Sequence, residues 1–240
     1  KILTDKNINS IKKDISREID LNINKAFDEK NIISTIDKEL NDVYRDFNFE
    51  PVQRSSVVEE MRFVDAISDS LKESMNKYNN LVLMGQDIAE YGGVFKVSEG
   101  FLDLFGKERV RNTPICESSI IEVAMGLSIC NRKSIVELQF SDFISSGFNP
   151  VVNYLAKIHY RWGQNADIVL RMPCGGGVGA GPFHSQTNEA WFTKTAGLIV
   201  VYPAFPDDAK GLLISSIENP NPVMFFEHKA LYRSIRGNVP

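Results

Sequence analysis

Several features that would point to particular protein classes are missing or scarce in this sequence. The three cysteines, Cys116, Cys130 and Cys174, lie far apart without Cys-x-x-Cys spacing, and an odd, scattered set argues against a disulfide framework. Lys and Arg number 27 against 31 Asp and Glu, a net charge of −4, which does not favour nucleic acid or anionic membranes. No apolar run approaches the roughly 20 residues that span a bilayer, and the first residues lack the apolar core of a signal peptide. We therefore expect a cytoplasmic protein with no nucleic-acid and no membrane partner.

The composition is sufficient for one hydrophobic core with an appendage, since 43% of the 240 residues are hydrophobic. Residues 1–48 have apolar side chains at helical spacing, including Ile15, Ile19 and Ile23, and predict amphipathic helices. Residues 49–60 contain Pro and Ser and predict a linker. The remaining residues, 61–240, predict a separate domain.

In this domain, short apolar runs alternate with helical patterns. Strands are expected at 81–85, 134–140, 167–172, 198–202 and 223–227. A helix is expected from Val58 onward, with Ile67, Leu71 and Met75 on one face. Further helices are expected at 117–131, 145–160, 189–195 and 206–218. Strands with little polar alternation, separated by helices, are typical of a parallel sheet that is buried on both faces. We predict an α/β fold with a mostly parallel sheet, helices on both faces, and an N-terminal helical segment.

A glutamate at the start of a predicted helix is the first candidate for chemistry. Glu117 follows the loop residues Ile115 and Cys116 and precedes a helix with an apolar face. In the simpler interpretation, its carboxylate only complements the helix dipole, which contributes roughly 0.3–1 kcal/mol. In the functional interpretation, a carboxylate on a rigid helix end is a general acid or base.

Two further segments are expected at the same edge of the sheet. Gln139 and Phe143 lie in a segment that runs off the end of a predicted strand, and His184 follows the glycine-rich loop 174–181 at the end of another. Ligand sites of open α/β sheets lie at the carboxyl ends of their strands. A carboxylate, an aromatic face and an imidazole together suggest a flat heteroaromatic ligand. Taken alone, however, His184 fits a capping role better than a catalytic one, and Phe143 fits a core role.

Five ordered motifs carry a resemblance to a known family. They are Asn112-Thr113-Pro114-Ile115-Cys116-Glu117; Glu137-Leu138-Gln139-Phe140-Ser141-Asp142-Phe143; Gly181-Pro182-Phe183-His184-Ser185-Gln186; Val201-Tyr202-Pro203 with Asp208-Ala209-Lys210-Gly211-Leu212-Leu213; and Phe226-Glu227-His228-Lys229-Ala230-Leu231-Tyr232. Together they resemble the β-subunit of the thiamine-diphosphate-dependent decarboxylating component of 2-oxoacid dehydrogenase complexes, of the branched-chain or pyruvate type. The resemblance covers residues 61–240, the pyrimidine-binding domain of that subunit.

The resemblance implies a role for each candidate residue. Glu117 would hydrogen-bond to the pyrimidine ring of thiamine diphosphate and promote its imino tautomer. Phe143 would stack on that ring, with Ile115 and Gln139 beside it. His184 would handle protons or orient groups during acyl transfer to a lipoyl group. These roles together imply oxidative decarboxylation of a 2-oxo acid.

The same family suggests metal ions and partner chains. Magnesium would be held by the α-half, whose Gly-Asp-Gly-type motif does not occur here, and a potassium ion is held in some relatives largely by backbone carbonyls. The expected potassium positions are Ala166, Ile168, Val169, Ser216, Asn219 and Asn221. Residues 1–48, ending in Leu40-Asn41-Asp42-Val43-Tyr44, resemble the C-terminal helices of the partner α-subunit. Since the sequence also starts without Met, we expect a piece of a fused α–β chain without its C-terminal domain, inactive alone.

Alternatives remain open from sequence. Transketolase and related thiamine enzymes share the domain and the activating glutamate, and a non-catalytic α/β interaction module would need Glu117 only as a cap. The expected partners are the α-type half, a lipoyl-bearing acyltransferase second component, and a second copy in a dimer or heterotetramer-like assembly. The sequence does not determine which 2-oxo acid is the substrate.

Overall fold

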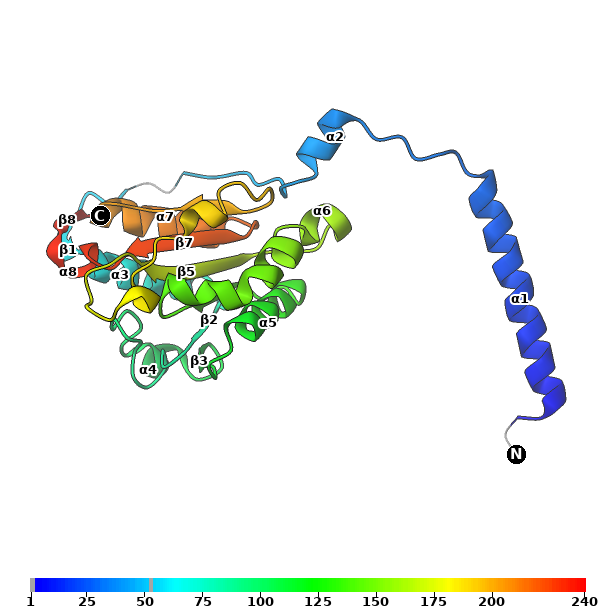
Figure 1. Cartoon of the computed structure of the whole chain (residues 1–240), viewed down its shortest axis with the longest axis horizontal. Helices are drawn as coiled ribbons and strands as arrows, with labels where there is room; N and C mark the ends of the chain where they lie inside the picture. Colours follow the sequence, from blue (N-terminus) through cyan, green and yellow to red (C-terminus); the bar gives the residue numbers. More distant parts are fainter. Residues whose placement is uncertain (1–2, 52–53) are drawn as a thin grey trace. The chain divides into compact units, whose positions relative to one another are not determined.

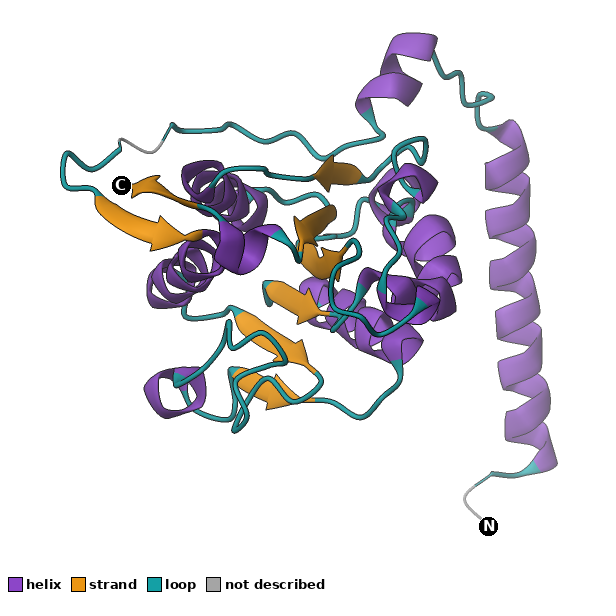
Figure 2. Cartoon of the chain, turned by 60° about the vertical axis from the view of Figure 1, so that its left-hand side comes forward, coloured by secondary structure: helices purple, strands orange, loops and turns teal. Residues whose placement is uncertain are grey.

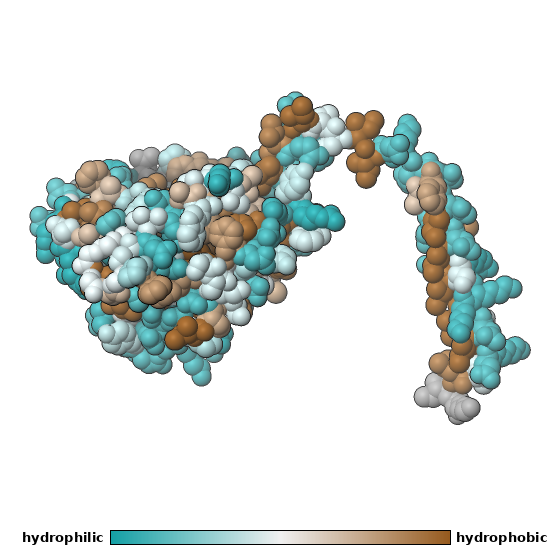
Figure 3. Space-filling model, viewed as in Figure 1, coloured by the Kyte–Doolittle hydropathy of each residue, from teal (hydrophilic) through white to brown (hydrophobic). Residues whose placement is uncertain are grey.

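The computed structural model describes residues 3–51 and 54–240, which form two compact units, Lys1–Leu40 and Asn41–Pro240. The first contains helix α1 (Asp5–Asp28), which begins where the side chain of Thr4 accepts a hydrogen bond from the backbone of Asn7. None of its described residues is buried, and its isoleucines form an apolar stripe along one side (Figure 3). The predicted N-terminal helix is therefore confirmed. Within the described ranges, no helix has both the length and the apolar character needed to cross a membrane.

The second unit is built on a parallel sheet of six strands in the order β3-β2-β4-β5-β7-β6 (Figures 1 and 2). All neighbouring strands in this sheet pair in parallel. The strands are β2 (Val82–Gly85), β3 (Val110–Asn112), β4 (Ser134–Glu137), β5 (Ile168–Cys174), β6 (Ile199–Val201) and β7 (Val223–His228). The predicted α/β class with a parallel sheet is confirmed.

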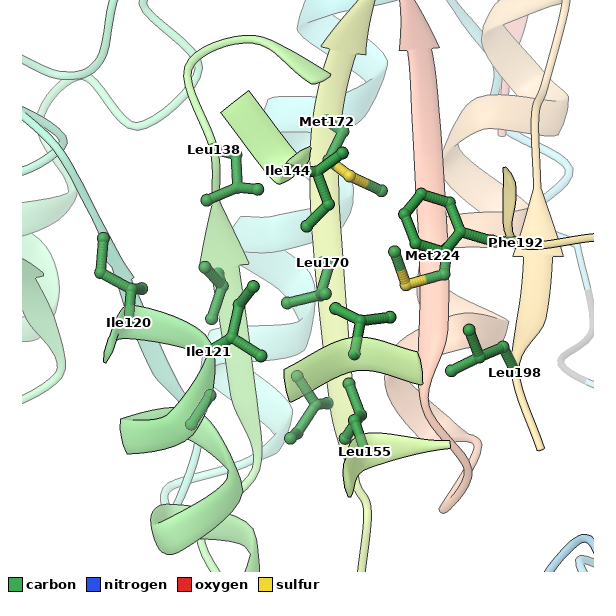
Figure 4. Close-up of a cluster of buried hydrophobic side chains, with 14 of the residues drawn as sticks. Ile120, Ile121, Leu138, Ile144, Leu155, Leu170, Met172, Phe192, Leu198 and Met224 are labelled. Carbon is green, nitrogen blue, oxygen red and sulfur yellow. The ribbon is translucent and has the colours of Figure 1, made fainter. Parts of the chain in front are cut away.

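Helices cover both faces of this sheet, as the apolar strand sequences require. On one face, α5 (Glu117–Ile129) and the helical turn η2 (Pro150–Leu155) pack on Leu170, Met224 and their neighbours (Figure 4). On the other face, α3 (Phe63–Lys77) and α7 (Pro206–Glu218) bury a second apolar cluster that includes Phe225. Two cores on opposite faces hold the strands, so their carboxyl ends have a fixed spacing.

One predicted helix starts later than expected. Residues before Phe63 form a strand, β1 (Glu59–Arg62), which pairs antiparallel with β8 (Arg236–Val239). Helix α3 starts after Arg62, whose backbone N–H and guanidinium both donate to the Asp65 carboxylate. The predicted start at Val58 is wrong because the strand's partner lies far along the chain, where no local pattern reveals it. The predicted apolar face of the helix is confirmed.

The predicted helices at 145–160 and 189–195 are also wrong in detail. The first is broken into the 3-10 turn η1 (Ser141–Gly147), the π turn η2 and the short helix α6 (Ile158–Trp162), and the second is a single turn, η4 (Glu189–Trp191). Gly147 lies so close to α5 that a Cβ atom there would be 2.5 Å from Ile121 Cδ1. η1 therefore packs tightly on α5. The remaining short elements are α2 (Ile36–Asn41), α4 (Phe101–Phe105), α8 (Leu231–Ser234) and η3 (Pro182–His184).

Candidate functional site

Glu117 is the first residue of α5, at the carboxyl edge of the parallel sheet. The loop before it is tied to the sheet, because the backbone N–H of Thr113 donates to Gly85 O at 2.9 Å. The half-buried Glu117 carboxylate accepts a hydrogen bond from Gln86 Nε2 at 3.2 Å. Gln86 is buried and directly follows β2, so its amide is held in place. The carboxylate therefore has a defined direction and a neutral donor beside it.

Gln139 and Ile115 are the other two predicted residues near this helix start. Gln139 lies two residues beyond the end of β4 and donates weakly to Gln86 O at 3.5 Å and to Asp87 Oδ2 at 3.4 Å. The structure thus connects Glu117 and Gln139 through Gln86. Ile115, two residues before Glu117, is 83% exposed.

Phe143 and His184 lie together in a cluster of aromatic rings. Their ring centroids are 5.5 Å apart with planes nearly perpendicular, and Phe140 contacts both, at 5.9 Å from Phe143 and 4.7 Å from His184. Phe95 packs on the far part of this cluster, 5.8 Å from Phe140. Edge-to-face contacts of this kind favour one ring orientation over others. The imidazole of His184 is therefore held by two rings from the segment that follows β4.

The loop that carries His184 is anchored by a buried carboxylate. Asp142, 5% exposed, accepts hydrogen bonds through Oδ1 from the backbone N–H groups of Ser185 at 3.0 Å and Gln186 at 3.1 Å. The carbonyl of Gln186 in turn accepts from the backbone of Gly175, at the start of the glycine-rich loop. Two backbone donors on one carboxylate oxygen fix the position of the loop directly after His184.

A buried ionic network lies beneath the site and joins three strands. The Arg171 guanidinium on β5 donates to Glu137 on β4 at 2.6 Å and to both oxygens of Glu227 on β7 at 2.7 and 2.8 Å. Tyr232 OH also donates to Glu227 at 2.6 Å. Burial raises the pKa of Glu137, although the Arg171 charge opposes that rise. The network fixes the strand ends from which Gln139 and the residues after β7 continue.

Three residues that contact the candidate side chains or their loop were given no role in the sequence-based prediction. Gln86 orients Glu117, Asp142 anchors the His184 loop, and Lys229 lies with its Nζ atom 5.1 Å from the centre of the Phe140 ring. Gln86 and Lys229 each directly follow a strand of the sheet. A position directly after a strand end can therefore indicate a residue near the site. The contacts that give these residues their roles, however, are made with segments far away in the sequence.

The predicted potassium positions lie at the opposite edge of the sheet. Ile168 and Val169 begin β5, and the polar members follow or end α7. Asn219 Oδ1 accepts from both the backbone and the amide of Asn221, and Asn221 Oδ1 accepts from the backbone of Arg45 at 2.8 Å. The side-chain oxygens of both asparagines therefore have protein partners. In the described ranges, no group of three or more His, Cys, Asp or Glu side chains is placed to hold a metal ion.

The fold and the candidate site together indicate the class of protein domain. Open parallel α/β sheets bind their ligands at the carboxyl ends of their strands, and this is the edge at which the chain places a carboxylate, amides and aromatic rings. The model of the family described as "Transketolase, pyrimidine binding domain" matches residues 59–234. The chain belongs to this family.

Curated relatives point within this family to 2-oxoacid dehydrogenases. The chain is 43% identical over 182 residues to the 2-oxoisovalerate dehydrogenase subunit beta of Bacillus subtilis. It is 40% identical over 183 residues to the pyruvate dehydrogenase E1 component subunit beta of Staphylococcus epidermidis, and equally to that of Staphylococcus aureus. Each match covers 75% of this chain and 56% of the relative, so the chain spans about half the length of these relatives.

A solved structure has a similar fold. It is described as a split-gene transketolase, an inactive beta4 tetramer, and the superposition has a TM-score of 0.56 at 17% identity. The match covers 69% of this chain and 51% of that one. At this identity the similarity concerns the fold alone.

Proposed function

We propose that this chain supplies the pyrimidine-binding half of the active site in the decarboxylating component of a 2-oxoacid dehydrogenase complex. The observation that carries the proposal is the family match over residues 59–234, with Glu117 at the start of α5 on the ligand-binding edge. The identity of 40–43% to beta subunits of 2-oxoisovalerate and pyruvate dehydrogenases supports this reaction class. The substrate in the proposal is a branched-chain 2-oxo acid or pyruvate.

The side chains at the edge fit an aminopyrimidine ring. Such a ring needs a carboxylate for its ring nitrogen, amide partners for its polar edge and apolar or aromatic surfaces for its faces. Glu117 offers a half-buried carboxylate, Gln139 a half-buried amide, and Phe143 a half-buried ring. The 83% exposed side chain of Ile115 is an apolar surface available for contact. This donor set agrees with the chemistry of thiamine diphosphate, the cofactor that the family implies.

Bound thiamine diphosphate would act as the electron sink for decarboxylation of the 2-oxo acid. The proposed role of Glu117 is to hold a proton between its carboxylate and the pyrimidine nitrogen. Gln86 keeps the carboxylate in line, since its amide donates to Oε1 and can neither take nor give a proton at neutral pH. His184, held by Phe140 and Phe143, would move a proton during acyl transfer to a lipoyl group.

The proposal requires partners that supply the rest of the site. A diphosphate-binding α-type half, with magnesium, would complete the cofactor site, and a lipoyl-bearing acyltransferase would accept the acyl group. We propose that residues 1–48 belong to such an α-half, that 49–60 link it to the domain at 61–240, and that the complete protein is a fused α–β chain that forms dimers. The chain alone is then inactive. The six-residue potassium site stays a prediction based on backbone carbonyls.

Turnover by the full-length protein tests this function. Decarboxylation of pyruvate and of 2-oxoisovalerate would be followed with thiamine diphosphate, magnesium and an artificial electron acceptor. The proposal predicts turnover of at least one of the two substrates. A folded protein that binds the cofactor and decarboxylates neither substrate would contradict it.

A further inference from the structure

Lys229 is a buried cation beside the candidate site for which neither the sequence nor the proposed reaction gives a role. It follows β7 directly, and its backbone is fixed at both ends: its N–H donates to Cys174 O at 3.0 Å, and its carbonyl accepts from Tyr232 N at 3.2 Å. The residue is only 7% exposed. Its ammonium has no hydrogen-bond partner among the residues that the structure describes. Burying an ammonium group without a hydrogen-bond partner costs free energy, so its presence beside the site calls for a functional explanation.

The contact that the ammonium does make is with an aromatic ring. Nζ lies over the Phe140 ring, 5.1 Å from its centre, within the range of a cation–π interaction. The same ring meets the imidazole of His184 edge to face, at 4.7 Å between centroids. Burial lowers the pKa of Lys229, and the nearby Asp142 carboxylate partly restores it. The Lys229 charge and the His184 ring therefore share one neighbour.

Polar atoms around this ring have incomplete hydrogen bonding. Asp142 Oδ2 and His184 Nδ1 are buried and, within the described part of the chain, have no partner. Asp142 uses its other oxygen to hold Ser185 and Gln186 directly after His184. The Lys229 ammonium and the His184 ring thus both contact Phe140, and within the described residues neither the ammonium nor His184 Nδ1 hydrogen-bonds to the Asp142 carboxylate.

We propose that Lys229 is a positioning residue for His184, whose ammonium fixes the Phe140 ring against the imidazole. The proposal rests on the proposed function for the role of His184 in acyl transfer. A direct role for Lys229 in binding the substrate carboxylate is less favourable, because the nearby Asp142 carboxylate would repel the same anion. Lys229 acts through Phe140 and does not touch the reacting atoms.

Chemical modification tests the position of His184 without turnover. The full-length, cofactor-free protein is treated with diethyl pyrocarbonate, and the rate at each histidine is read by mass spectrometry, with His159 as the internal reference. Lys229→Met should speed modification of His184 about threefold, the factor that loss of one cation–π contact supplies. Lys229→Arg, which keeps the charge, and Lys107→Met, which removes an exposed charge elsewhere, should match wild type. An unchanged rate in folded Lys229→Met protein would overturn the proposal.

Partial reactions separate this role from the proposed function. Lys229→Met should lower acylation of a lipoyl domain about tenfold or more, as misplacement of a catalytic group does, and leave decarboxylation with an artificial acceptor within about twofold. His184→Ala with Lys229→Met should cost no more than His184→Ala alone. Intact acylation in Lys229→Met, or a raised KM for the 2-oxo acid as its only effect, would refute positioning. A wild-type protein without decarboxylase activity would refute the proposed function, while the modification rates would still decide the position of His184.

Discussion

Arg171 is the residue whose removal should most damage the fold beneath the site. Its side chain and that of Glu227 are 0% exposed, and that of Glu137 is 3% exposed. Arg171→Met removes three charged hydrogen bonds of 2.6 to 2.8 Å and leaves two carboxylates buried without a counter-charge. Breaking a buried pair in this way costs about 3–5 kcal/mol, which is roughly a fifth or more of a typical unfolding free energy of about 5–15 kcal/mol.

Urea unfolding of the full-length protein, followed by near-UV circular dichroism, measures this loss. Arg171→Met should lower the unfolding free energy by about 3–5 kcal/mol, whereas Arg132→Met, at an exposed arginine, should change it by less than about 0.5 kcal/mol. Replacing both carboxylates by glutamine in the Arg171→Met background should recover part of the loss. A cost below about 1 kcal/mol for Arg171→Met would show that the network does not hold the strands.

The pH dependence of stability gives the sign of the Glu137 contribution. Burial raises the pKa of its carboxyl in the folded protein, so the folded state binds more protons than the unfolded state over that interval. Its contribution therefore favours folding below the ordinary glutamate pKa of about 4.3 and is lost as the pH rises through the raised value. As the pH rises through this interval, the unfolding free energy of Glu137→Gln should fall less than that of the wild-type protein. An identical slope in both proteins would contradict the assignment.

The remaining predictions concern the segment 41–48, which hydrogen-bonds to Asn221 through Arg45, and the cofactor. The Asn221 side chain accepts a hydrogen bond from Arg45 N at 2.8 Å and donates one to Arg45 O at 3.0 Å. Two hydrogen bonds are worth about 1–3 kcal/mol, so Asn221→Ala should speed proteolysis within 41–48 about fivefold or more. Equal proteolysis rates in this variant and in the surface control Asn153→Ala would contradict this prediction. Calorimetry of the chain alone with thiamine diphosphate and magnesium should show no measurable binding, and micromolar affinity would contradict the need for an α-half.

The sheet was predictable because buried parallel strands have a local signature. The runs around Leu83, Leu170 and Phe225 are short and apolar, and each lies in a strand of the sheet. The pairing of β1 with β8 was not predictable, since it joins segments at the two ends of the domain. The segment expected as one helix at 145–160 is helical but divided into η1, η2 and α6, and a helical pattern does not show such divisions.

The candidate site was predictable at the level of its motifs. Phe143 and His184, expected at one edge from strand ends alone, lie with their ring centroids 5.5 Å apart. The side chains that orient these groups were not predictable. Gln86 and Lys229 acquire their roles from contacts with α5 and with Phe140, which depend on three-dimensional distances that residue spacing does not contain.

Decarboxylation by the full-length protein with and without Glu117→Gln tests the central claim most directly. Glutamine keeps the size of the side chain but cannot hold the proton at the pyrimidine nitrogen, so turnover should fall about 100-fold or more, while Glu122→Gln, at an exposed position of the same helix, should keep wild-type turnover. If Glu117 only complements the helix dipole, the change costs no more than about 0.3–1 kcal/mol of stability. Full activity in a folded, cofactor-bound Glu117→Gln protein would contradict the account.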